Sequence, residues 1–219
     1  MYKFFLYSML VILYLGLAKT LSPSELGISY LQNEKSFSKL TDKPHVTFIL
    51  TDTHVTGFLI KTYYQKYRVI TGYEEVEDLI LRASKEFTQK NLDNIGLSIY
   101  RRSNGEEEFT PLPPGSLYLN DPEFGEWKKN KEGNKEWHFN KSYKNFPRYL
   151  GWNDFRPDEK FYSEMLLSKR LGQTFYGLNQ EFGPLGSVTQ KAFPHFFSPE
   201  RQKKMDLKTL LIDYFKENF

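Results

Sequence analysis

Residues 73–91 read YEEVEDLILRASKEFTQKN, and this stretch decides the class of fold that we expect. Its apolar residues lie on one face of a 3.6-residue repeat. Its acids lie toward the start and its lysines toward the end, as the helix dipole favours, and Thr71 is a suitable N-cap. We therefore expect an α-helix over 73–91.

Strand patterns lie on both sides of this predicted helix. Residues 45–50 and 95–101 are short runs rich in apolar and β-branched side chains, which are typical of strands. Asn104-Gly105 is the preferred pair for a tight hairpin turn, so 106–110 should return as the partner strand. The expected fold class is α+β, with a small antiparallel sheet packed on one or two helices.

Residues 53–70 carry two conflicting patterns. Ile60, Tyr63, Tyr64 and Tyr67 recur at helical spacing. The many β-branched residues nearby, together with Gly57, favour a strand instead. We predict a second strand that pairs with 45–50, with a helix as the alternative.

Residues 1–18 have the pattern of a secretory signal peptide. Lys3 precedes an uninterrupted apolar run, and Gly16 and Ala18 are the small residues expected before a cleavage site. The run is shorter than the roughly 20 residues that span a bilayer as a helix. We expect export with cleavage after Ala18, and membrane contact only if the segment is retained.

The rest of the chain is expected to form one body. Residues 19–42 are polar and mixed, and we expect a mobile N-terminal segment there. Residues 43–219 should fold as a single globular α+β unit, with 111–115, a proline-rich corner, as a possible internal boundary.

Composition limits the compartment and the partners. The chain has no Cys, so disulfides are impossible although export usually permits them. Its 30 Lys and Arg nearly balance 27 Asp and Glu, which argues against a nucleic-acid binder. An exported, Cys-free, Lys-rich chain fits the bacterial envelope, either periplasmic or extracellular.

The region after residue 115 is rich in aromatic residues and in loops. Aromatics make up 17% of the whole chain. Residues 126–139 predict a hairpin with a three-residue loop at 131–133, in which Trp127 lies opposite Trp137 and Lys128 lies opposite Glu136.

Two helices are expected in the same region. One should run from about Arg156 to Leu171, with acids in its first turn and Gly172 as its C-terminal cap. A C-terminal helix is expected from Ser198, because apolar side chains recur at helical spacing from Leu207 to Phe215.

The sequence contains no recognisable catalytic motif. The four His are isolated and Cys is absent, so we expect no metal site and no cofactor. Glu126 and Asp154 lie among aromatics, as acids in sugar-binding clefts often do, and are weak candidates for acid–base catalysis. An exported hydrolase of cell wall or other polysaccharide is the alternative that they support.

Aromatic and amide side chains are the best candidates for binding. Neighbouring indoles form either a packing device or a platform for a sugar or a protein partner. We expect a non-catalytic exported protein that docks on another exported protein or on a cell-wall polymer. A periplasmic small-ligand binding module is a further alternative. The candidate binding residues are Trp127, Trp137, Trp152, Tyr176 and Asn179.

Overall fold

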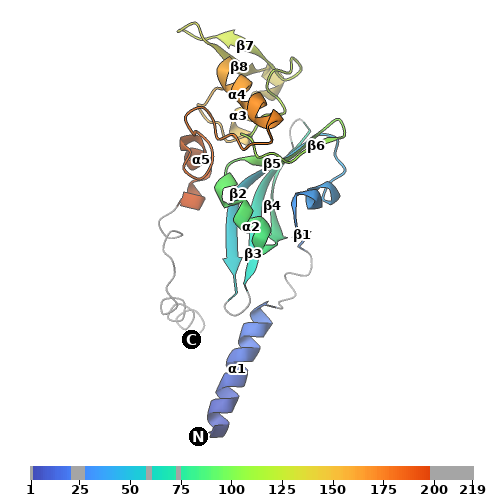
Figure 1. Cartoon of the computed structure of the whole chain (residues 1–219), viewed down its shortest axis with the longest axis vertical. Coiled ribbons are helices and arrows are strands. Elements are labelled where there is room, and N and C mark those ends of the chain that lie inside the picture. Colours follow the sequence, from blue (N-terminus) through green and yellow to red (C-terminus); the bar gives the residue numbers. More distant parts are fainter. Residues whose placement is uncertain (1, 21–27, 58–60, 73–74, 198–219) are drawn as a thin grey trace.

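The computed structural model describes residues 2–20, 28–57, 61–72 and 75–197 (Figure 1). In chain order the elements are α1 (Tyr2–Thr20), β1 (Tyr30–Leu31), the 3₁₀ helix η2 (Glu34–Lys39), β2 (Val46–Thr56), β3 (Thr62–Thr71), β4 (Glu75–Ala83), α2 (Lys85–Lys90), η3 (Leu92–Asn94), β5 (Ser98–Ser103), β6 (Glu106–Glu108), β7 (Gly125–Lys129), β8 (Lys135–Phe139), η4 (Lys141–Tyr143), α3 (Phe146–Tyr149), α4 (Glu159–Arg170), α5 (Ser187–Ala192) and η5 (Pro194–Phe197).

The fold is α+β, as the sequence predicts. Six strands form one sheet in the order β1-β4-β3-β2-β5-β6, and β7 pairs with β8 in a second, small sheet. All neighbours in the large sheet are antiparallel except β1 and β4. The two sheets lie at different places along the molecule, with β7–β8 at the end remote from α1 (Figure 1).

The predicted helix over 73–91 is wrong for most of its length. Residues 75–83 form β4, which pairs antiparallel with β3 along all of that range. Only Lys85–Lys90 is helical, and Ser84 caps it by accepting a hydrogen bond from the Phe87 amide. Leu79, Leu81 and Ala83 also alternate at strand spacing, so pairing with β3 overrides the local helical pattern.

The ambiguous stretch after residue 53 resolves as strand. β2 continues to Thr56 and β3 begins at Thr62, and the two pair antiparallel from Val46↔Thr71 to Thr56↔Thr62. The prediction of a second strand paired with the first is confirmed. The Asn104-Gly105 turn is also confirmed, since β5 and β6 pair on either side of it.

Each face of the large sheet covers its own core. On one face Phe48 and Tyr67 pack against Phe37 of η2 and Phe87 of α2. Phe37 is fully buried and η2 carries a capping box from Asn33, so this part of the predicted mobile segment is packed into the fold. α1 covers all but the first residue of the predicted leader, and no helix within the described ranges is long and apolar enough to cross a membrane.

The other face of the sheet meets the aromatic-rich region after residue 111. Ile49 and Ile70 from the sheet share a core with Trp137, Trp152 and Phe161. The proline-rich corner belongs to this core. Leu112, which is fully buried, pairs with Ser98 of β5 through two backbone hydrogen bonds.

The two predicted elements of the aromatic-rich region that lie in the described range are present. In the β7–β8 hairpin Trp127 lies opposite Trp137 and Lys128 opposite Glu136, and the Asn130 amide donates to the Asn134 carbonyl to close the loop. α4 begins after Asp158, whose side chain caps it. The predicted helix from Ser198 lies outside the described residues.

Candidate binding surface

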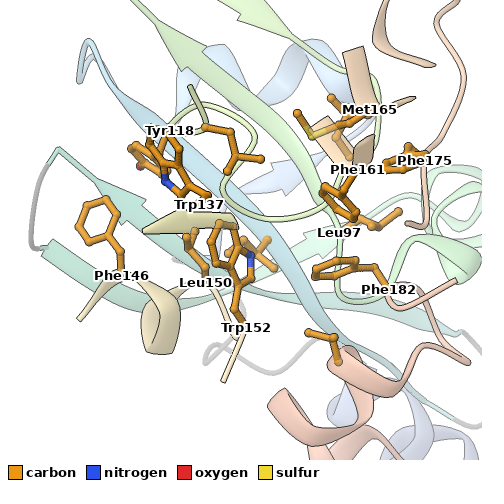
Figure 2. Close-up of a cluster of buried hydrophobic side chains, with 14 of the residues drawn as sticks. Leu97, Tyr118, Trp137, Phe146, Leu150, Trp152, Phe161, Met165, Phe175 and Phe182 are labelled. Carbon is orange, nitrogen blue, oxygen red and sulfur yellow. The ribbon is translucent and has the colours of Figure 1, made fainter. Parts of the chain in front are cut away.

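Two of the three candidate tryptophans are core residues (Figure 2). Trp137 is 1% exposed and Trp152 is 2% exposed. The Trp152 indole donates a hydrogen bond to the Pro114 carbonyl at 2.8 Å, and its ring lies against Gly115, where an added Cβ would lie 2.5 Å from Trp152 Cζ2. These two indoles are therefore unavailable as exposed anchors, which corrects the sequence-based assignment.

Trp127 is the tryptophan that reaches the surface. Its indole is partly exposed and donates a hydrogen bond to Asn120 Oδ1 at 2.8 Å. It packs edge-on against Trp137, with 5.2 Å between ring centroids, and lies 5.9 Å from the ring of Tyr162 on α4. We call Asn120, Trp127 and Tyr162 the Trp127 surface. Its geometry is fixed before any partner arrives, because the core holds one side of the indole.

The predicted loop residues Tyr176 and Asn179 stabilise their own turn. The Glu181 carboxylate accepts two hydrogen bonds from Asn179, one from its backbone amide and one from its side-chain amide, each at 3.0 Å. Tyr176 is half-buried against Gly183, and burial, with the nearby charge of Asp93, raises its pKa. The contacts of these side chains are those of a well-packed turn.

The two candidate catalytic carboxylates lie at the surface of the molecule. Glu126 is exposed and lies 3.0 Å from Lys128, and Asp154 is exposed. Burial alone would raise the pKa of Asp78, but its pairs with Lys66 and Arg68 hold the pKa below its usual value. A glycosidase acid needs the opposite shift.

Glu107 and Glu34 are carboxyl groups whose pKa is likewise lowered by their partners. Hydrogen bonds from Ser38, Arg102 and Tyr100 lower the pKa of Glu107. The pKa of Glu34 is also lowered, because its pair with Lys90 outweighs the effect of burial. Within the described part of the chain, no group of three His, Asp or Glu residues is placed to hold a metal ion.

A hollow of about 550 Å³ lies between β3, β4 and α3, and no sequence pattern predicted it. Its lining consists of Arg68, Val76, Glu77, Asp78, Arg148 and Tyr149, so two acids face two arginines. Arg68 is fixed, since it lies 3.5 Å from Asp78 and over the ring of Phe193. Arg148 is exposed and stacks on Tyr149, and its guanidinium forms no ion pair with the residues that the structure describes.

Comparison of the chain with protein-family models, with curated proteins and with solved structures finds no match in any of the three. The fold and the surfaces described above are therefore the basis for a functional proposal.

Proposed function

We propose that this is an exported, non-catalytic interaction protein that docks on another exported protein or on an envelope polymer through the Trp127 surface. Export rests on the leader pattern of residues 1–18, and the absence of Cys and the balanced charge agree with an envelope location.

The observation that carries the proposal is the fixed, partly exposed indole of Trp127. Binding hot spots are enriched in Trp and Tyr, whose large rings lose little conformational freedom on binding. Trp127 is held by the hydrogen bond from its indole nitrogen to Asn120 and by the edge-to-face contact of its ring with Trp137. A pre-organised aromatic of this kind reduces the entropic cost of association.

A catalytic role has less support. A hydrolase requires two carboxyl groups in a cleft, one of them with a raised pKa. Glu126 forms an exposed ion pair with Lys128 instead, and both Glu126 and Asp154 are open to solvent. These contacts favour binding over hydrolysis.

The experiment is co-purification of the full chain, after chemical cross-linking, from its native envelope. Trp127→Ala should weaken partner recovery about thirty-fold, the size of a hot-spot loss of about 2 kcal/mol. Tyr63→Ala is the matched control, because it truncates a half-buried aromatic on β3 of the large sheet. Equal recovery with both variants, each shown to be folded by cooperative urea denaturation, would contradict the proposal.

A further inference from the structure

The surroundings of the Trp127 indole are polar. Within residues 93–166, all of which the structure describes, no large apolar side chain is more than partly exposed. The nearest exposed ones along the chain are Leu92 and Leu167. Stable protein–protein interfaces bury about 800 Å² on each partner and have an apolar centre. A single indole among polar side chains therefore fits a ligand with a small apolar face and a polar rim better than it fits a protein.

Hydrogen-bonding groups that have no partner border the same indole. Asn120 is exposed, and its Oδ1 accepts the indole N–H at 2.8 Å, so the side-chain amide nitrogen of Asn120 remains available to donate. The ring of Tyr162 lies 5.9 Å from the indole, and its hydroxyl forms no hydrogen bond with the residues that the structure describes. The rim of the Trp127 surface thus carries polar groups that a ligand can use.

Lys129 adds a donor on the same face of the hairpin. Side chains alternate along a strand, so Lys129 lies on the face of Trp127, about 7 Å further along β7. It is directly opposite Lys135, and like charges in this arrangement destabilise a strand pair. Lys135 is paired with Glu159 at 2.8 Å, whereas Lys129 forms no ion pair within the described ranges. A ligand with acceptor oxygens accounts for Lys129 better than hairpin stability does.

The acids of the two strands lie on the other face of the hairpin. Glu126 and Glu136 alternate with the two tryptophans along β7 and β8. There Glu126 pairs with Lys128 at 3.0 Å, and Glu136 accepts a hydrogen bond from the Asn130 side chain at 2.7 Å. The strand groups that remain free on the face of Trp127 are therefore donors.

We propose that the partner of the Trp127 surface is a polysaccharide, one pyranose ring of which stacks on the exposed part of the indole. The negative face of an indole attracts polarised C–H groups, and a pyranose ring presents such groups on its flat side. Its hydroxyl and acetamido oxygens accept hydrogen bonds from Asn120 and Lys129, and the Tyr162 hydroxyl either donates or accepts. This inference rests on the proposed function, since it names the partner of the same surface.

The test is titration of the purified full chain with three hexasaccharides. The probes are chitohexaose and cellohexaose, which are uncharged, and a hyaluronan hexasaccharide, which carries carboxylates. Trp137 and Trp152 are buried, so a sugar that stacks on Trp127 should change the fluorescence of that indole alone. We expect a saturable change with at least one probe. Trp127→Ala should weaken the affinity measured by calorimetry at least tenfold, whereas Tyr63→Ala should leave it unchanged.

Two pairs of conservative variants test the polar rim. Tyr162→Phe should weaken binding about fivefold, the size expected for one hydrogen bond. Tyr149→Phe removes a hydroxyl from a half-buried tyrosine on α3 and should have no effect. Lys129→Gln should also weaken binding about fivefold. Lys128→Gln, an equal loss of charge on the opposite face of β7, should not.

Co-purification separates this inference from the proposed function. If Trp127→Ala loses a protein partner that the parent recovers, and none of the three hexasaccharides binds, the polysaccharide is overturned and docking through Trp127 stands. Equal recovery with Trp127→Ala and Tyr63→Ala would overturn both. The polysaccharide is also overturned if Trp127→Ala binds the hexasaccharides as tightly as the parent, or if neither rim variant differs from its control.

Discussion

The indole rings of Trp127 and Trp137 lie edge to face across the β7–β8 pair, with 5.2 Å between their centroids and 67° between their planes. Trp137 is buried by the core, whereas Trp127 is partly exposed. One ring therefore acts as a fixed support for the other, and this relationship connects the packing of the molecule to the proposed docking surface.

The tight contact between Gly115 and Trp152 gives a prediction about stability. Gly115→Ala should lower the free energy of unfolding by about 1–3 kcal/mol more than Gly105→Ala, because the new methyl group overpacks the core. Both glycines have a positive φ, of 92° and 84°, but no atom lies within 4 Å of the Cβ position at Gly105. Urea denaturation measures the difference, and equal losses would mean that Trp152 is not packed there.

The buried hydroxyl of Tyr118 gives a prediction about alkaline pH. Burial raises the pKa of Tyr118 to about 12, whereas tyrosine in an unfolded chain has a pKa of about 10. Between these values the folded state keeps a proton that the unfolded state has lost, so stability falls as pH rises. At pH 11 the ionisation of this tyrosine in the unfolded chain should lower the free energy of unfolding by about 1.4 kcal/mol.

Tyr118→Phe should therefore lose less stability than the parent between pH 8 and pH 11, measured by urea denaturation. Tyr30→Phe, at a tyrosine that is 54% exposed, should behave like the parent. If the free energy of unfolding falls equally in the parent and in Tyr118→Phe over this pH range, Tyr118 is not buried in solution.

The leader pattern gives a prediction about the mature N-terminus. Cleavage after Ala18 should leave a protein that begins at Lys19, and intact mass spectrometry of the chain from its native host measures this directly. Replacing Ala18 by Gln should block the cut, because the position before the cleavage site requires a small residue. A mature chain that retains residues 1–18 would contradict the prediction.

Elements defined by local chemistry were predictable from the sequence. The β7–β8 register follows from Gly133 in a three-residue loop, since this fixes which residues oppose each other. α4 follows from Asp158 at its start and Gly172 at its end. In both elements the residues that determine the structure are close together in the chain.

Features that depend on distant contacts were not predictable. β4 has a helical pattern, and it is a strand because β3 lies beside it. Trp137 and Trp152 are buried by segments as far apart as Leu97 and Phe182, which no local pattern around an indole reveals. Arg148 lines the hollow for a similar reason, since α3 is brought to β3 and β4 by the fold.

Site-specific photo-cross-linking in the native cell tests the docking proposal most directly. A benzophenone side chain at position 162, beside the Trp127 indole, should form a covalent adduct with a partner. The same group at position 63 on β3 should form none, and the adduct at 162 should disappear when Trp127→Ala is added. An adduct at 63 but not at 162, or an adduct at 162 that survives Trp127→Ala, would contradict docking through this surface.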